Sequence, residues 1–295
     1  MSSLTDLSND IVAIVEGVGP SIVRVDARRG RPATGIVLEA NLVLTADHVI
    51  EQEDAIQVQA GTSALKATVA GRDPETDLAL LRTEKLAAPP IARGASSPVR
   101  IGELVLAVGR AGELQVTLGV VSGLSGGFRS WRAGETERLI QTTADLLPGF
   151  SGGPLLGSDG RLVGINSWNF SRGITRALPL ETAQRIAESL KSHGRIRRAY
   201  LGLGAQPVRL ADAAAAQAGQ PTALLVITVE AGGPAQQAGL MQGDTVVAVD
   251  GTPVHQLDDL FNALRAMEVG SSHRLRVIRA GETRELSVTA GERQR

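Results

Sequence analysis

Short aliphatic segments fill the chain from Ser21 to Pro179 and restrict what it can fold into. About a dozen of them, including SIVRVDA, NLVLTA and ELVLAVG, are rich in Val, Ile and Leu and follow one another at roughly ten-residue spacing. Gly, Pro, Asp and Asn separate them, and none has apolar residues at the three- and four-residue steps of a helix. The pattern predicts a mostly β domain, built as a barrel or a sandwich.

Two amphipathic helices are expected at the ends of this β region. The first, at about 4–18, has an apolar stripe of Leu4, Leu7, Ile11, Ile14, Val15 and Val18. The second, at about 180–193, has the stripe Leu180, Ala183, Ile186, Ala187 and Leu190. Gly194 is the expected C-cap of the second helix, which should close the first domain.

The sequence from 195 to 295 predicts a second, smaller domain. A chain of 295 residues has reached the length, ~250–300 residues, at which a single hydrophobic core usually stops growing. In this part the strand candidates ALLVITV and TVVAVD alternate with a short helix entered at Pro234 and a longer one at 257–267. We therefore expect a β domain at 1–194 and a small α+β domain at 195–295.

Composition excludes several classes of function. Thirty Lys and Arg balance 31 Asp and Glu, so the formal net charge is -1, which argues against nucleic acid or an anionic membrane as a partner. Cysteine is absent, which excludes disulfides and thiol nucleophiles, and the four His are scattered along the chain. No phosphate-binding loop, dinucleotide fingerprint or HExxH motif occurs, so neither a cofactor nor a catalytic metal is expected.

The N-terminal segment MSSLTDLSNDIVAIVEGV indicates no export signal. It carries acidic residues where a signal peptide needs basic ones, and polar residues interrupt its apolar positions too often for a membrane span. The chain as given is therefore expected to be soluble, to lack an integral membrane segment and, by sequence alone, to be cytoplasmic.

Three motifs contain the residues needed for nucleophilic catalysis. In PGFSGGPL, small neighbours would let a carbonyl approach Ser151, although such a string can equally be an ordinary glycine-rich turn. VLTADHVI supplies His48 as a base just after an apolar strand, and DPETDLALL supplies Asp77 as the acid that orients it. The order His, Asp, Ser is that of chymotrypsin-type enzymes, not of subtilisins or α/β-hydrolases.

With these motifs the sequence resembles the HtrA/DegP-type serine proteases, in which a chymotrypsin-like double β-barrel is followed by a PDZ domain. The resemblance covers nearly the whole chain. It rests on the three motifs above, on LGVVSGL and GRLVGINS, and on YLGLG and GGPAQQAGLMQGDTVVAVDGTPV in the second domain. It implies an ATP-independent serine endopeptidase that degrades unfolded or damaged polypeptides in protein quality control.

The resemblance also implies roles for individual residues. Ser151 would be the nucleophile, His48 the general base and acid, and Asp77 the group that fixes the imidazole tautomer. The backbone N–H groups of Gly149 and Ser151 would form the oxyanion hole, so the conformation of the loop at 147–151 decides whether that hole exists.

The motif YLGL is similar to the carboxylate-binding loop of PDZ domains. The resemblance assigns Tyr200, Leu201, Gly202 and Leu203 to this loop, whose backbone N–H groups would receive the C-terminus of a peptide. The peptide would add as a strand beside the helix at 257–267. Alternatively, this module folds and only packs on the protease.

The sequence departs from the family pattern beside the catalytic serine and in the activation loop. Family members usually have Asn before the catalytic serine, where this chain has Phe150, and the activation loop of the family is trimmed near Arg110 to Gln115. In the substrate pocket we expect Trp168, Asn169 and Phe170, which follow GINS, to wall the primary specificity pocket, and Phe150 to shape the non-prime subsites. The alternative is that Trp168 only covers the end of the barrel.

The short loop RRGRPATG lacks the long insertion that the family uses in cage assemblies, so a homotrimer is expected. The trimmed activation loop keeps a second function open. In this alternative the protein is chaperone-like, or binds peptides through the PDZ domain, and the protease scaffold is weakly active or inactive. The family mostly works in the periplasm or cell envelope, which leaves the compartment undecided.

Overall fold

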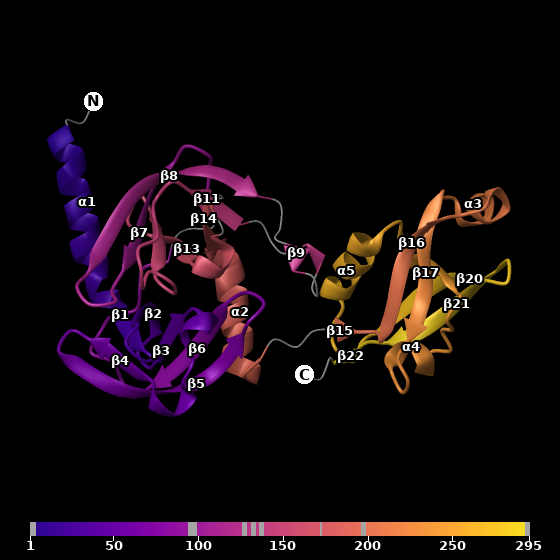
Figure 1. Ribbon diagram of the computed structural model, residues 1–295, viewed down its shortest axis with the longest axis horizontal. Coiled ribbons are helices and arrows are strands. Elements are labelled where there is room, and N and C mark those ends of the chain that lie inside the picture. The colour runs from indigo at the N-terminus through magenta and orange to yellow at the C-terminus, as the bar shows by residue number, and fades with distance from the viewer. Residues whose placement is uncertain are drawn as a thin grey trace. The chain divides into compact units, whose positions relative to one another are not determined.

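The computed structural model describes residues 4–93, 99–125, 129–130, 134–135, 139–171, 173–195 and 199–292. It divides into two compact units, one made of residues 1–128 and 136–196 and the other of residues 129–135 and 197–295 (Figure 1). The junction at 196–198 lies outside the described residues. Each unit is therefore described by itself.

The first unit contains two closed six-stranded barrels, as the chymotrypsin-like resemblance predicts (Figure 1). The first barrel has the order β1-β2-β3-β6-β5-β4, with β1 Ile22–Asp26, β2 Ala33–Glu39, β3 Leu42–Thr45, β4 Gln57–Ala60, β5 Ser63–Asp73 and β6 Leu78–Thr83. The second has the order β11-β14-β13-β12-β7-β8, with β7 Leu104–Gly109, β8 Gln115–Ser125, β11 Leu139–Thr142, β12 Pro154–Gly157, β13 Leu162–Asn166 and β14 Thr175–Pro179. Closure leaves these barrels without free sheet edges.

Aliphatic side chains fill the barrel cores. One cluster inside the first barrel consists only of Val, Ile, Leu and Ala, among them Val23, Val43, Ile56 and Leu81. Closely packed aliphatic side chains bury their apolar surface and contribute about 1.5–3 kcal/mol each, so a chain without cysteine can hold such a barrel by packing alone.

Two helices pack against the barrels. α1 Leu4–Val18 leads into the turn η1 Gly19–Ser21, and Ile11, Ile14 and Val15 pack on the core that the barrels share. α2 Leu180–His193 buries the stripe that contains Ala183, Ile186, Ala187 and Leu190. Gly194 ends α2 in the left-handed conformation, and its N–H donates to the Leu190 carbonyl.

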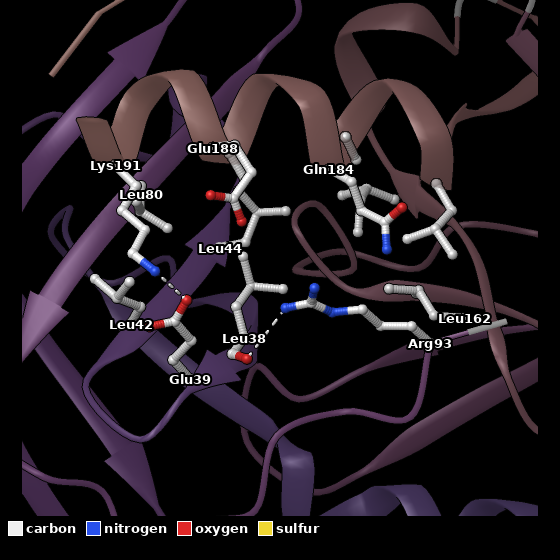
Figure 2. Close-up of a pocket in the computed structure, with 14 residues that line it drawn as sticks. Leu38, Glu39, Leu42, Leu44, Leu80, Arg93, Leu162, Gln184, Glu188 and Lys191 are labelled. Atoms are coloured by element: carbon white, nitrogen blue, oxygen red, sulfur yellow. Dashed lines mark hydrogen bonds and ion pairs between the residues drawn. The ribbon is translucent and has the colours of Figure 1, made fainter. Parts of the chain in front are cut away.

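An open groove of about 440 Å³, a volume that includes adjoining solvent, lies between α2 and the strands of the first unit (Figure 2). Leu42, Leu44 and Leu80 line its apolar part, and an ion pair between Lys191 and Glu39 lies at one end. None of the residues proposed for catalysis or peptide binding lines this groove.

The second unit is a small α+β domain built on the strand order β16-β17-β18-β20-β21, so β16 lies at the edge of this path. Its strands are β15 Ala199–Tyr200, β16 Leu203–Arg209, β17 Thr222–Val229, β18 Thr245–Val249, β19 Thr252–Pro253, β20 Ser272–Arg279, β21 Glu282–Thr289 and β22 Gly291–Glu292. Its helices are α3 Asp212–Ala218, α4 Pro234–Gln237 and α5 Leu257–Ala266.

The remaining short elements of the described chain belong to both units. β9 Arg129–Ser130 and β10 Gly134–Glu135 pair as antiparallel strands in the second unit, and the turns η2 Asp47–Val49, η3 Glu53–Ala55 and η4 Trp168–Phe170 lie in the first.

A buried carboxylate in this second unit is paired with an arginine. The Asp244 side chain is almost fully buried, and its carboxylate accepts hydrogen bonds from Arg279 Nε at 2.7 Å and from the Met241 N–H at 2.8 Å. Burial by itself raises the pKa of Asp244, but these donors outweigh it, so the pKa stays below its ordinary value. Asp244 therefore remains ionised and connects the turn before β18 to β20.

Candidate active site

His48 and Asp77 lie together where two strands of the first barrel meet. His48 is in η2, just after β3, and Asp77 directly precedes β6, the strand that pairs with β3. The His48 Nδ1 atom lies 2.9 and 2.8 Å from the two carboxylate oxygens of Asp77, and the His48 backbone N–H donates to Oδ1 at 2.9 Å. The pairing of β3 with β6 thus brings a base and a carboxylate from separate motifs into direct contact.

Asp77 is held in an uncommon backbone conformation. Its φ is 54°, in the left-handed region, which Asp tolerates better than most residues, and only 2% of its surface is exposed. Because an ionised carboxylate only accepts hydrogen bonds, it keeps a proton on Nδ1 of His48 and leaves Nε2 available as a base.

Ser167 is a member of this site that the sequence analysis did not single out. Its hydroxyl donates to Oδ2 of Asp77, and only 2% of its surface is exposed. The motif GINS contained this residue, but a serine that ends an apolar strand carries no signal of its own partner. The structure identifies it as a third donor to the Asp77 carboxylate.

Ser151 lies in the loop between β11 and β12 of the second barrel, 2% exposed. In the described residues its Oγ has one hydrogen-bond partner, the backbone N–H of Trp168 at 3.2 Å, and no hydrogen bond to His48 is present. Because Oγ accepts from Trp168, its own proton remains available to a base. Contacts between nucleophile and base often tighten only when substrate binds.

The loop before Ser151 forms a type II turn. The Phe150 N–H donates to the Leu147 carbonyl at 3.0 Å, and Gly149, the third residue of the turn, has φ of 90°. A positive φ at this position defines type II, where glycine is favoured and proline suits the position before it, as in Pro148-Gly149. A Cβ on Gly149 would also lie 2.3 Å from the Cβ of Ala111.

The backbone amides of this loop fall into two groups. The N–H groups of Phe150, Gly152 and Gly153 donate to backbone carbonyls at 2.9 to 3.0 Å. In the part of the chain that the structure describes, the N–H groups of Gly149 and Ser151 have no acceptor. These are the two amides that the resemblance assigns to an oxyanion hole.

Arg72 holds the turn that carries His48. Its guanidinium donates to Oδ1 of Asp47 at 2.6 Å, to the Asp47 and Ile50 carbonyls and to Glu53. The hydrogen bond with Asp47 raises the pKa of Arg72. Asp47 precedes His48, so this arginine fixes both ends of η2.

The prediction for the substrate pocket is wrong for two of its four residues. Phe150 is fully buried in the core of the second barrel, where its ring occupies the space beside Gly109, and a Cβ on that glycine would lie 2.2 Å from it. Phe170 is 6% exposed and packs in the core shared by the barrels. A substrate cannot reach side chains that the barrel core encloses. Trp168 is 48% exposed and Asn169 is exposed, so the assignment of these two stays a prediction.

The loop YLGL lies beside the edge strand of the second unit. Leu201 is buried, Gly202 has φ of 75°, and β16 begins at Leu203. The Gly202 carbonyl accepts from the Glu230 N–H at 2.8 Å, and the Tyr200 hydroxyl donates to the Glu230 carboxylate beneath the loop. Figure 1 shows α5 beside β16, which together would border a strand-shaped ligand.

Comparisons with known proteins agree with this architecture. Residues 33–165 match the model of the trypsin-like peptidase domain, and residues 199–290 match that of the PDZ domain. A probable periplasmic DegP-like serine endoprotease of Ectopseudomonas mendocina is 34% identical over 285 residues, which covers 92% of this chain and 60% of that protein. Over both of its domains the chain is thus similar to DegP-like serine endoproteases. A second such relative, from Halomonas elongata, is 33% identical over 90% of this chain and 57% of its own length.

Solved structures of HtrA-type proteins have the same fold. The serine endoprotease from Yersinia pestis has a TM-score of 0.79 at 26% identity, covering 97% of this chain and 98% of that one. The HtrA-type protease AlgW with a decapeptide has a TM-score of 0.79 at 26% identity, covering 96% and 99%. The chain spans about 60% or less of the length of the curated relatives named above. None of the helices in the described part of the chain has the length and apolar content needed to cross a membrane.

Proposed function

We propose that this chain is an ATP-independent serine endopeptidase that cleaves unfolded or damaged polypeptides, and that its PDZ domain binds peptide C-termini. The observation that supports the peptidase most directly is the pairing of the His48 imidazole with the Asp77 carboxylate. Ser151 supplies the nucleophile, and the N–H groups of Gly149 and Ser151, which have no acceptor among the described residues, supply the oxyanion donors. The matches to the trypsin-like peptidase and PDZ domain models support the presence of both domains that such a function needs.

In the proposed reaction Ser151 Oγ attacks the carbonyl carbon of a peptide bond while Nε2 of His48 accepts the hydroxyl proton. The carbonyl oxygen becomes an oxyanion, which accepts hydrogen bonds from the N–H groups of Gly149 and Ser151. His48 then gives its proton to the leaving amine, and an acyl-enzyme forms. Water, deprotonated by His48, attacks this ester, and His48 then gives that proton to Ser151 Oγ as the bond to the acyl carbon breaks and the acid is released.

A fluorophosphonate probe tests the peptidase proposal, because it forms a covalent bond with an activated serine. We expect the probe to label the native full chain at Ser151 and not to label His48→Ala. The wild type should cleave casein before it reacts with the probe and should not cleave it afterwards. Ser158→Ala, which changes an exposed serine in the turn after β12, should label as the wild type does. A folded wild-type protein that is neither labelled nor active on casein would refute the proposal.

The absence of a hydrogen bond between His48 and Ser151 in the described residues favours a second candidate function. In this alternative the protein is chaperone-like and its protease site is weakly active. If the probe does not label the wild type and the wild type still suppresses the aggregation of client proteins, this alternative is supported. A wild type that cleaves casein efficiently would contradict it.

The PDZ assignment makes Gly202 important for peptide affinity. Its left-handed φ is paired with close packing, since a Cβ would lie 3.1 Å from the Tyr200 hydroxyl. We expect Gly202→Ala to weaken binding of peptides with an apolar C-terminus by about tenfold, equal to about 1.4 kcal/mol, in a fluorescence-polarisation assay.

Gly219→Ala is the matched control for this prediction. Gly219 also has a left-handed φ, 73°, but a Cβ there meets nothing within 4 Å. This variant carries the same backbone strain and should bind peptides as the wild type does. Equal affinity of an amidated peptide and its free-acid form would show that the loop does not recognise a carboxylate.

We also propose that the protein forms a homotrimer. Leu104 on β7 and Val116 and Leu118 on the paired strand β8 are 37%, 39% and 48% exposed. Apolar side chains exposed on neighbouring strands are typical of surfaces that a partner covers. These residues support contact between subunits, and the number of subunits follows from the family alone.

A further inference from the structure

Thr34 connects the first barrel to the loop that carries Ser151. It lies in β2, its side chain is fully buried, and its backbone N–H donates to the Ser151 carbonyl at 3.2 Å. Its hydroxyl donates to the Gly149 carbonyl at 2.7 Å and accepts from the Arg110 N–H at 2.7 Å. All these residues belong to the first unit.

The direction of the hydroxyl proton follows from its two partners. The Arg110 N–H can only donate, so Thr34 Oγ1 must be its acceptor. The Gly149 carbonyl can only accept, so the Thr34 hydroxyl must give it its single proton. The relay therefore runs from Arg110 through Thr34 to Gly149 with every proton assigned. Arg110 is itself tied to the Gly19 carbonyl through its guanidinium at 3.1 Å.

The two carbonyls that Thr34 holds belong to the same residues whose amides are proposed to bind the oxyanion. An unanchored turn can exchange between type II and type I, which changes φ of its third residue from about +80° to about −90° and turns the preceding peptide over. The third residue here is Gly149, and the peptide that would turn over carries its N–H. The Gly149 and Ser151 carbonyls belong to the peptides that follow these residues, so their bonds to Thr34 hold the neighbouring peptides of the loop in the arrangement that accompanies φ of 90° at Gly149.

We propose that Thr34 is a positioning residue for the oxyanion loop, through the hydrogen-bond relay from Arg110 to Gly149. This inference rests on the proposed peptidase function. In this role Thr34 is a second contribution of the first barrel to catalysis, besides His48 and Asp77. Arg110, at the start of the loop that is trimmed relative to the family, takes part through its N–H, which donates to Thr34.

Thr34→Val tests the relay, because valine keeps the shape of threonine and removes the hydroxyl. The Gly149 carbonyl and the Arg110 N–H would each lose a buried partner. We expect kcat on a peptide substrate and the rate of fluorophosphonate labelling to fall by about 10²-fold, as when one oxyanion donor is lost, with KM little changed. Thr34→Ser, which keeps the hydroxyl, should recover most of the rate.

The pH profile separates positioning from general damage. Within the described residues Thr34 forms no hydrogen bond with His48 or Asp77, so the midpoint of the pH–rate profile of Thr34→Val should equal that of the wild type. Thr83→Val is the matched control: Thr83 is a buried threonine of the same barrel whose hydroxyl donates to the Glu84 carbonyl, away from the loop. It should react at the wild-type rate.

The outcomes are distinct. If the wild type reacts and a folded Thr34→Val reacts equally fast, this inference alone is overturned. The same holds if Thr83→Val loses as much of the rate as Thr34→Val, or if Thr34→Ser does not recover the rate. An unreactive, folded wild type would overturn the peptidase proposal and this inference with it. If the valine variant does not fold, Thr34→Ala, which introduces no methyl in place of the hydroxyl, provides the same comparison with Thr34→Ser.

Discussion

Ser151→Ala is expected to reduce peptide-bond cleavage by about 10⁶-fold, because it removes the atom that attacks the carbonyl. The fold should tolerate the change. The Ser151 backbone remains bonded to the Thr34 N–H, and the lost hydroxyl has the Trp168 N–H as its partner in the described residues. Loss of one such hydrogen bond costs about 1 kcal/mol of unfolding free energy. Casein cleavage measured beside the thermal unfolding curve checks both expectations.

Ser151→Ala can retain a small part of the cleavage activity. The oxyanion amides and bound substrate can retain some catalysis over water without the nucleophile, so the rate need not vanish. Ser158→Ala controls for the loss of a serine at an exposed turn. A Ser151→Ala variant that still cleaves at more than about a hundredth of the wild-type rate would contradict the assignment of Ser151 as nucleophile.

Asp77→Asn is expected to lower kcat by about 10⁴-fold with little change in the fold. The Asp77 side chain accepts hydrogen bonds from the His48 N–H, the His48 ring and the Ser167 hydroxyl. An asparagine can accept through only one atom and must donate through the other. Where its amide nitrogen faces Nδ1, the imidazole proton moves to Nε2, and His48 can no longer accept the proton of Ser151.

The test measures kcat over a range of pH for the wild type, Asp77→Asn and a buried-carboxylate control. Asp73→Asn serves as that control, since Asp73 is also buried and its carboxylate accepts from the Thr76 hydroxyl. The expected result is a deep loss for Asp77→Asn alone. If Asp77→Asn kept a tenth or more of the wild-type kcat while its unfolding curve matched that of the wild type, Asp77 would not be the orienting acid.

Periodicity and turn residues were sufficient to predict the fold class. The aliphatic segments between Ser21 and Pro179 predicted a β domain, and the resemblance predicted two barrels, which the structure and the family comparisons confirm. α2 covers the residues of its predicted stripe because an amphipathic helix is a local pattern, with Gly194 ending it. The second domain followed from its motifs in the same way, and its match to the PDZ model confirms it.

The specificity pocket shows where local reasoning fails. Phe150 is next to the proposed nucleophile in sequence, which suggested a position in the substrate cleft. The type II turn at 147–150 instead directs its side chain into the second barrel, where Gly109 leaves room for the ring. Sequence position says nothing about the side to which such a turn directs a residue. Phe170 lies in η4, and its position after GINS did not show that its side chain packs into the core that the barrels share.

By itself the sequence determined that the chain forms β barrels and a PDZ domain, and which Ser, His and Asp could act together, because these follow from residue type, local spacing and family motifs. Only the tertiary structure decided the partners. The Asp77 carboxylate meets His48 through the pairing of β3 with β6, Ser167 reaches it from the second barrel, and Thr34 holds the carbonyls of Gly149 and Ser151. These contacts join residues far apart in the chain, and their geometry depends on how the barrels close and pack.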